Sequence, residues 1–168
     1  MRILPLVFVK DLTADEVRAV SGLTHAHQIS WIACEIYLGF AWCLWHGANP
    51  KQALEALHDL PDDFKRLPDI ANLKREDIRS SGFVIDTLEA ALWCLMTTDN
   101  YKDCVLTAVN LGEDTDTVAA VAGGLAGILY GTGGENGIPE EWIAQIARKG
   151  WIKDLCDQFF ETVFDQCV

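Results

Sequence analysis

Basic residues are scarce in this chain. It has 13 Lys and Arg against 25 Asp and Glu, which gives a formal net charge of -12 at pH 7 over 168 residues. Nucleic acids and anionic membranes attract proteins through a basic surface, so the charge argues against both as partners. Half of the residues are hydrophobic, which argues against disorder and gives a chain of this length enough material for one buried core.

Paired cysteines are also missing. The sequence has six cysteines: Cys34, Cys43, Cys94, Cys104, Cys156 and Cys167. They form no C-x-x-C pair, and no His lies at the spacing of a zinc ligand. Each has apolar neighbours, where a free cysteine usually behaves as a small hydrophobic residue. We therefore expect a reduced, cytoplasmic protein without disulfides.

No apolar run reaches the ~20 residues that a membrane-spanning helix needs. The longest, Ile29 to Trp45, has 17 residues and contains Glu35. Gln28, Glu35 and His46 fall on one line of a helix, which indicates a buried helix with one solvated stripe. Glu35 is therefore expected to be solvated rather than catalytic.

The opening MRILPLVFVKD resembles a signal peptide only superficially. Its apolar run is short and is followed directly by Lys10 and Asp11, with no small-residue cleavage site, so we reject a signal peptide. The chain starts in core-like sequence without a polar lead-in, as though it began inside a domain.

Alternation of apolar and polar residues, typical of strands, is missing, so we expect an all-α fold. Thr13-Ala-Asp-Glu16 is a capping box that predicts a short helix to about Val20. Asn49 and Pro50 are typical of an N-cap and a first helical residue. Residues 61–79 carry charges and two prolines, which predicts a surface loop with short helical pieces. Further helices are expected at about 83–96, at 101–110, from near Thr115, after Pro139, and, separated from that one by Gly150, up to Phe164.

Residues 110–131 read NLGEDTDTVAAVAGGLAGILYG. A helix that begins near Thr115 would place Asp114 or Thr115 at its N-cap, where a carboxylate also favours the positive end of the helix dipole. Capping alone explains most short motifs of this kind. Here, however, five consecutive side chains from Glu113 to Thr117 offer oxygen atoms, and such crowded negative charge favours a bound cation. Oxygen ligands indicate a hard ion, Mg²⁺ or Mn²⁺, rather than zinc.

The same stretch has Gly123, Gly124 and Gly127 inside the expected helix. Each interior glycine costs about 1 kcal/mol of helix stability relative to alanine. We therefore expect another backbone to pack very close to this helix, on the face that Gly123 and Gly127 share. Such a helix would be buried at the centre of the fold and would hold its acidic N-terminus rigidly.

This segment resembles the C-terminal signature of the ADP-ribosylglycohydrolase family, which includes dinitrogenase reductase-activating glycohydrolase. The resemblance continues through SGFVIDTLEAALW (residues 81–93), LTHAH (residues 23–27) and MRILPLVF at the start, so it covers the whole chain. It implies a compact multi-helix bundle with a binuclear magnesium or manganese site. It also implies hydrolysis of the N- or O-glycosidic bond that joins ADP-ribose to a modified protein side chain.

The resemblance assigns roles motif by motif. It implies that Asp114, Asp116 and Thr117 are metal ligands, that His25 lies near the bound ADP-ribose, and that Phe83 stacks on the adenine. Without the family, a His in such a turn is usually a satisfied polar residue, and a Phe at the start of a helix is usually part of the core.

The family pattern also has an N-terminal part that this sequence does not contain: a Gly-Asp-rich opening, a T-D-D-T-like motif with the other metal ligands, and a G-N-G-S-like turn for the diphosphate. Met1 coincides with an internal methionine of the usual family chain. Three protein oxygens do not complete two octahedral ion sites. We therefore expect residues 1–168 to form a single domain that lacks its N-terminal helices and carries half of an active site.

Three interpretations stay open. The first is a metal-dependent hydrolase present as a partial domain, and the second is a non-catalytic structural or ADP-ribose-binding relative. The third is an unrelated helical scaffold with a fortuitous acidic cap, which requires the glycine-rich helix to lie at the surface. The expected partners are ADP-ribose or an ADP-ribosylated protein. Apolar surface left uncovered by missing helices also predicts association of the chain with itself or with a complementary N-terminal chain.

Overall fold

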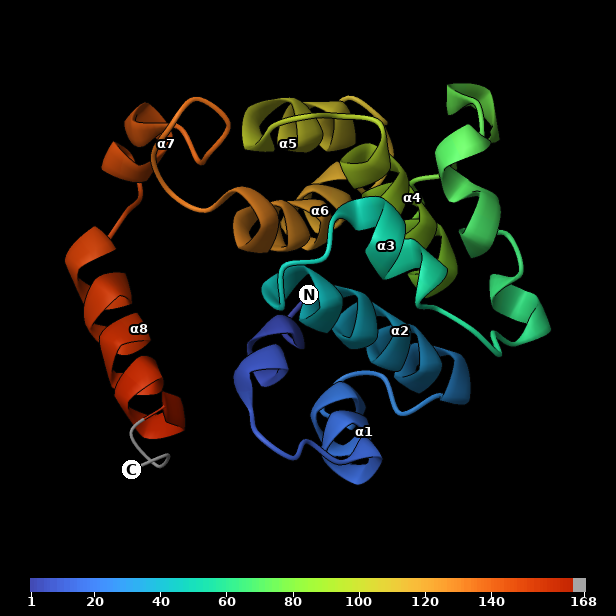
Figure 1. Cartoon of the computed structure of the whole chain (residues 1–168), viewed down its shortest axis with the longest axis horizontal. Helices are drawn as coiled ribbons and strands as arrows, with labels where there is room; N and C mark the ends of the chain where they lie inside the picture. The colour runs from blue at the N-terminus through green and yellow to red at the C-terminus, as the bar shows by residue number, and fades with distance from the viewer. Residues whose placement is uncertain (165–168) are drawn as a thin grey trace.

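The computed structural model describes residues 1–164, and these form an all-α fold, as the sequence predicts (Figure 1). Within them the extended backbone is limited to one isolated bridge between Thr132 and Ile138. The helices are α1 (Ala14–Gly22), α2 (Gln28–Trp45), α3 (Pro50–Glu55), α4 (Val84–Met96), α5 (Tyr101–Val109), α6 (Thr115–Tyr130), α7 (Glu140–Ala144) and α8 (Lys149–Phe164). Short 3₁₀ helices are η1 (Leu4–Phe8), η2 (Asp62–Phe64), η3 (Leu67–Asn72) and η4 (Arg75–Asp77).

The glycine-rich helix α6 lies at the centre of the bundle and packs against α2, α4 and α5 (Figure 1). Its buried residues are Val118, Val121, Ala122, Leu125 and Ala126. A fortuitous acidic cap on a surface helix is therefore excluded, because the helix behind the acidic motif forms part of the core.

Side chains, rather than a second backbone, pack against the three glycines of α6. The prediction that another backbone packs close to this helix is therefore wrong. A Cβ atom on Gly123 would lie 3.4 Å from the Tyr101 hydroxyl oxygen, and one on Gly127 would lie 4.0 Å from the same ring. A Cβ atom on Gly124 would lie 2.8 Å from the Tyr37 hydroxyl oxygen. The side chains of Tyr37 and Tyr101, together with Leu4 at Gly124 and Val105 at Gly123, thus occupy the space that larger residues would fill.

The helix starts follow from local hydrogen bonds. Thr13 and Glu16 form the capping box of α1, and Asn49 with Gln52 forms that of α3. Both helix starts were predicted, since the bonded residues are only three positions apart in the sequence.

The solvated stripe predicted on α2 is present only in part, because the Glu35 Oε1 atom is buried with no hydrogen-bond partner among the described residues. Gln28 and His46 are exposed, and the Glu35 side chain is 38% exposed with its Oε1 atom 3.8 Å from Arg18 Nε. Among the described residues, no helix is long and apolar enough to cross a membrane.

The short helical pieces predicted in residues 61–79 are present as η2, η3 and η4, but the segment is more than a surface loop. The short helices η2 and η3 bury Phe64, Leu67 and Ile70 completely, and η3 packs against α4. The prediction was incomplete because the charged residues between these apolar positions dominated the composition.

The C-terminal helix differs from the prediction. Gly150 lies inside α8, and the chain turns before it, at Gln145–Arg148, where Arg148 has a φ of 55°. Helix α8 buries none of its residues and stands beside the bundle (Figure 1). Its contacts with the bundle include the ring of Phe8, whose centroid is 6.3 Å from those of Phe159 and Phe164.

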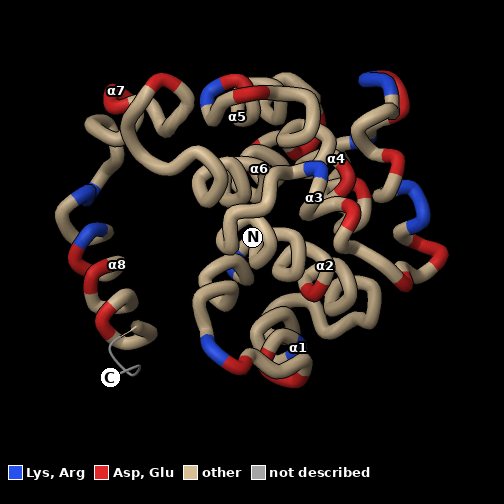
Figure 2. Tube along the Cα trace, viewed as in Figure 1, with Lys and Arg blue, Asp and Glu red and all other residues tan. Residues whose placement is uncertain are grey.

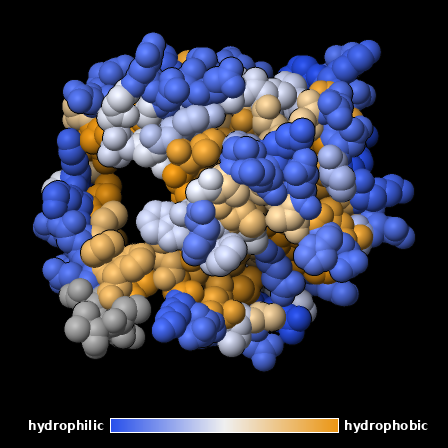
Figure 3. Space-filling model, in the orientation of Figure 1, coloured by the Kyte–Doolittle hydropathy of each residue, from blue (hydrophilic) through white to orange (hydrophobic). Residues whose placement is uncertain are grey.

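Large apolar side chains of α8 are exposed as a result: Trp151, Ile152, Leu155, Phe159 and Phe160. Figure 3 shows hydrophobic residues around an opening between the side of the molecule where α8 lies and the bundle. Acidic residues spread over the outside, with Lys and Arg interspersed among them (Figure 2). The surface of the described residues is therefore acidic with an apolar region at α8.

Five cysteines in this part of the chain are free, and Cys167 lies outside the described residues. Cys94 and Cys104 are buried as small apolar side chains, whereas Cys156 on α8 is exposed, contrary to the expectation from its neighbours.

Candidate functional site

A cavity of about 690 Å³ brings together four of the five residues that the sequence singled out. Asp114 and Thr117 reach it from the start of α6, Phe83 from the residue before α4, and His25 from the loop between α1 and α2. These positions are up to 92 residues apart in the sequence, so the fold alone creates the site. Asp116 does not line the cavity.

Asp114 occupies the N-cap position of α6, yet its side chain makes no capping hydrogen bond. Its Oδ1 atom instead accepts a hydrogen bond from the Thr117 hydroxyl at 2.8 Å. A cap normally satisfies one of the free N–H groups of the first turn. The capping explanation therefore accounts for the position of Asp114 but not for where its carboxylate points.

Asp116 lies at the solvent side of the same turn. Its side chain is exposed, and its Oδ1 atom accepts a hydrogen bond from the Thr117 N–H at 2.9 Å. Interaction with the Asp114 carboxyl group, and then this backbone hydrogen bond, lower the pKa of Asp116. Asp114, Asp116 and Thr117 thus form one group of side-chain oxygens, of which two members face the cavity.

Gly82 leaves room for the Asp114 carboxylate. A Cβ atom at position 82 would lie 2.9 Å from Asp114 Oδ2, closer than real Cβ contacts come. The sequence analysis did not single out Gly82, although it lies in the SGFV segment. This contact joins residues 32 positions apart and leaves no local signal in the sequence.

The loop before α6 is held by the segment that precedes α4. The Asp114 N–H donates to the Ser80 carbonyl oxygen at 3.0 Å, and the Ser80 hydroxyl donates to the Gly112 carbonyl oxygen at 2.8 Å. The Arg75 guanidinium donates to the Leu111 carbonyl oxygen. Sequence reasoning missed Arg75 and Ser80, because both act through backbone atoms of a distant loop.

Phe83 is the N-cap of α4, one residue before the helix that was expected to begin there. It is 52% exposed and lines the cavity, so about half of its surface is accessible to a ligand. The Ser81 hydroxyl accepts from the Phe83 N–H at 3.1 Å and donates to Asp86 Oδ2, which fixes the turn. A Phe at the start of a helix is usually part of the core, but Phe83 is exposed and is not a core residue.

His25 and His27 both line the cavity but differ in role. His27 is the N-cap of α2, and its Nδ1 atom accepts from the Ile29 N–H at 3.3 Å. The backbone of His25 bonds to Ser21, and the His25 ring is exposed at the cavity. His27, which the sequence analysis did not consider, is the satisfied polar residue that a histidine in such a turn usually is. The His25 imidazole is available for a ligand.

The floor of the cavity is apolar and includes Tyr37 and Cys34. Tyr37 donates its hydroxyl proton to the Val121 carbonyl oxygen at 2.9 Å. Burial raises the pKa of the Tyr37 hydroxyl and of the Cys34 thiol, so both are neutral at pH 7. The remaining apolar lining comes from Met1, Ile3, Val20, Ile29, Ala33, Val84, Leu88 and Val121.

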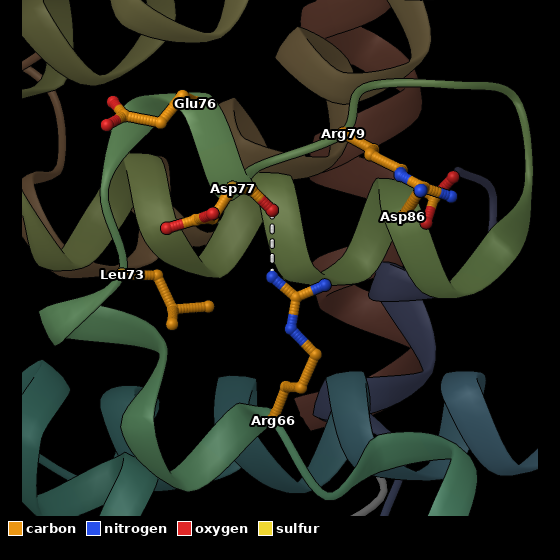
Figure 4. Close-up of a pocket in the computed structure, with 6 residues that line it drawn as sticks. All are labelled: Arg66, Leu73, Glu76, Asp77, Arg79 and Asp86. Carbon is orange, nitrogen blue, oxygen red and sulfur yellow. Dashed lines mark hydrogen bonds between the residues drawn. The ribbon is translucent and has the colours of Figure 1, made fainter.

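A second cavity, of about 480 Å³, lies between the loop of residues 66–79 and α4 (Figure 4). It is lined by Arg66, Leu73, Glu76, Asp77, Arg79 and Asp86. Arg66 donates to the Asp77 carbonyl oxygen at 2.8 Å and pairs with the buried Glu89 at 3.0 Å. These contacts tie the loop to α4, and none of the residues predicted for the site lines this cavity.

The oxygens at the start of α6 suit a hard divalent ion, because they are two carboxylates and a hydroxyl held in one turn. In residues 1–164, however, no three His, Cys, Asp or Glu side chains come together as a metal site would require. The residues present therefore fit part of an ion's coordination shell, and further oxygen ligands must complete it.

Comparison with known proteins bears on this arrangement. The sequence profile of the ADP-ribosylglycohydrolase family matches residues 1–167. A solved structure described as an ADP-ribosylglycohydrolase-related protein complex superposes with a TM-score of 0.77 at 26% identity, covering 95% of this chain and 57% of the other.

Curated relatives agree with it. ADP-ribosylarginine hydrolase Tri1 of Pseudomonas putida is 48% identical over 148 residues, and Tri1 of Serratia proteamaculans is 38% identical over 144 residues. These alignments cover 84% and 83% of this chain but 38% of each relative. ADP-ribosyl-[dinitrogen reductase] glycohydrolase of Rhodospirillum rubrum is 30% identical over 133 residues, which are 79% of this chain and 43% of that protein. The chain thus spans about two fifths of the length of these relatives, and with its profile match over residues 1–167 it belongs to the ADP-ribosylglycohydrolase family.

Proposed function

We propose that this chain carries the ADP-ribose pocket and part of the metal site of a hydrolase that removes ADP-ribose from modified protein side chains. One observation carries the proposal. A single cavity of about 690 Å³ unites His25, Phe83, Asp114 and Thr117, four of the five residues to which the family resemblance gives ligand or metal roles. Its volume falls in the range of about 300–1,000 Å³ that is typical of small-molecule sites.

The pocket suits the two ends of ADP-ribose differently. The exposed ring of Phe83 offers a flat apolar face for the adenine, since nucleobases stack on aromatic side chains. The polar end, at Asp114 and Thr117, suits ribose hydroxyls and an ion that binds them. The apolar floor between them excludes water from the buried part of the ligand.

Asp114, Asp116 and Thr117 would hold a Mg²⁺ or Mn²⁺ ion. Such an ion acts as a Lewis acid on oxygen atoms of the ligand. The protein's own contribution is orientation, because the Thr117 hydroxyl fixes Asp114 Oδ1 and the Thr117 N–H fixes Asp116 Oδ1. A preorganised carboxylate pair keeps its position while charge develops at the sugar carbon during glycosidic bond cleavage.

The first substrate to test is ADP-ribosylated arginine, because the two Tri1 relatives are named ADP-ribosylarginine hydrolases. The proposed partners are therefore ADP-ribose and ADP-ribosylated proteins. The exposed apolar side of α8 supports a further partner, either a second copy or a complementary chain of the same fold.

Titration of the chain with ADP-ribose, followed by NMR of the backbone amides, tests the pocket. We expect shifts around residues 25, 83 and 114–117. Phe83→Leu should weaken binding by about 1–3 kcal/mol through lost stacking. Phe160→Leu is the matched control, because Phe160 is similarly exposed, at 57%, but lies on α8 outside the cavity. Shifts confined to other regions would contradict the assignment of this cavity to ADP-ribose.

The alternative function is an ADP-ribose-binding relative without turnover, favoured by the incomplete set of metal ligands in the described residues. An assay of ADP-ribose release from an ADP-ribosylarginine peptide, with Mg²⁺ or Mn²⁺ present, separates the two. Binding with release supports the hydrolase. Binding without release, even after a complementary family chain is added, supports the binding relative.

A further inference from the structure

The loop that presents Asp114 has an uncommon backbone. Gly112 and Glu113 both have a positive φ, at 91° and 55°. The left-handed region suits glycine but disfavours a residue such as Glu113, so contacts from the surroundings must hold it there. What holds this loop therefore also determines where the Asp114 carboxylate lies.

Ser80 contacts the backbone of the first residue of this left-handed pair and of the residue that follows the pair. Its hydroxyl donates to the Gly112 carbonyl oxygen at 2.8 Å, and its own carbonyl oxygen accepts from the Asp114 N–H at 3.0 Å. Ser80 is only 3% exposed, so water has little access to replace its hydroxyl. A second contact, from the Arg75 guanidinium to the Leu111 carbonyl oxygen, holds the loop one residue earlier.

We propose that Ser80 is a positioning residue for the metal half-site, whose hydroxyl fixes the loop so that the Asp114 carboxylate faces the cavity. This rests on the proposed function, because Asp114 is the group whose position matters. The effect passes through the Gly112 carbonyl and the left-handed pair to Asp114, which the Thr117 hydroxyl then holds at 2.8 Å.

The same segment also connects the two ends of the pocket. Three residues after Ser80 comes Phe83, the proposed adenine contact, and between them Gly82 lies against Asp114 Oδ2. A change at Ser80 therefore acts first on the carboxylate end, while the turn at Phe83 keeps its own hydrogen bond to the Ser81 hydroxyl.

The test compares Ser80→Ala with wild type and with Thr98→Val. Thr98 is a matched control, because its hydroxyl also donates to a backbone carbonyl, that of Cys94 at 2.7 Å, and it does not line the cavity. Ser80→Thr retains the hydroxyl but adds a methyl group at a buried position, so its Asp114 exchange and Mn²⁺ affinity should lie closer to wild type than those of Ser80→Ala. Should Ser80→Ala fail to fold, Ser80→Cys keeps the volume with a weaker donor and takes its place.

Two readouts separate the positioning role from the proposed function. The first is hydrogen exchange at the Asp114 amide, which we expect to be about tenfold faster in Ser80→Ala and unchanged in Thr98→Val. Exchange at Asp114 that is unchanged in Ser80→Ala would overturn the positioning role.

The second readout is Mn²⁺, followed by broadening of the amide signals of residues 114–117. Outer contacts to metal ligands typically change affinity 10- to 100-fold, so we expect Ser80→Ala to bind Mn²⁺ about tenfold more weakly. Equal Mn²⁺ affinity of Ser80→Ala and wild type would also overturn the positioning role. Absence of Mn²⁺ broadening in wild type, together with faster exchange in Ser80→Ala, would overturn the metal half-site and leave the structural contact in place.

Discussion

The Gly82→Ala substitution places a methyl group directly against the Asp114 carboxylate. The added Cβ atom would lie 2.9 Å from Asp114 Oδ2, whereas ordinary contact begins at 3.4 Å, so the two atoms must separate by about 0.5 Å. The backbone of Gly82 has no positive φ, so alanine is conformationally acceptable there. The whole adjustment therefore falls on the carboxylate.

The expected effect on stability is small and that on the site is large. The carboxylate is the free end of a short side chain, and surface changes of this kind usually stay within about 0.5 kcal/mol. Metal–ligand distances, in contrast, tolerate only about 0.2 Å. We therefore expect Mn²⁺ affinity to fall about tenfold, or ~1.4 kcal/mol.

Mn²⁺ titration by NMR broadening and thermal unfolding measure the two effects separately. Gly39→Ala is the control, because a Cβ atom on Gly39 meets nothing within 4 Å. It should leave Mn²⁺ binding unchanged and stabilise α2 by about 0.5–1 kcal/mol. Wild-type Mn²⁺ affinity in Gly82→Ala would refute the reasoning that Asp114 Oδ2 contributes to the ion site.

Other substitutions and conditions test further parts of the structure. Gly124→Ala should destabilise the fold by about 1–3 kcal/mol, because its Cβ atom would lie 2.8 Å from the Tyr37 hydroxyl oxygen. Denaturant unfolding measures this, with Gly39→Ala as the control, and equal stability of the two variants would contradict it. Burial raises the pKa of the Glu89 carboxyl group above 4.5, and the charge of Arg66 partly offsets this rise. The folded protein therefore favours the protonated carboxyl group. The stability that this shift provides is fully present below the pKa of the unfolded chain and is lost as the pH rises through the folded pKa. Wild type should therefore lose stability relative to Glu89→Gln as the pH rises above about 4, and a constant difference would argue against this. The chain alone should bind Mg²⁺ or Mn²⁺ weakly, and calorimetry that finds two tightly bound ions would disprove the half-site. The apolar residues of α8 predict association that increases with salt, and a monomer by sedimentation at low and high salt would count against it.

Helix starts and the central helix could be predicted because their signals are local. The capping boxes at Thr13 and Asn49 involve residues three positions apart. The glycines inside α6 predict close packing around the helix, because an interior glycine lowers helix stability and is kept only where a larger residue does not fit. The crowding itself comes from Leu4, Tyr37, Tyr101 and Val105, whose contacts with α6 are set by tertiary packing. The sequence therefore predicted close packing around α6 but not which side chains pack there.

The error at Gly150 and the incomplete prediction for residues 61–79 have different causes. Gly150 was treated as a helix breaker, but helix α8 accommodates it because its turn has already been made at Arg148. In the loop, the buried Phe64, Leu67 and Ile70 recur every third residue, which matches the three-residue turn of a 3₁₀ helix. That spacing was present in the sequence and would have indicated a packed segment.

The group of oxygens at the start of α6 breaks several local rules at once. Asp114 occupies a cap position without capping, which forgoes about 1 kcal/mol, and Glu113 adopts a left-handed conformation that costs about 1–2 kcal/mol. A sequence selected only for stability would cap this helix with the Asp114 side chain. Instead the carboxylate accepts from Thr117 and faces the cavity, while Ser80 and Arg75 hold the loop from another segment. Violations of local preference that are supported by distant contacts are typical of functional sites, and here they converge on the one carboxylate that joins the cavity to the acidic motif.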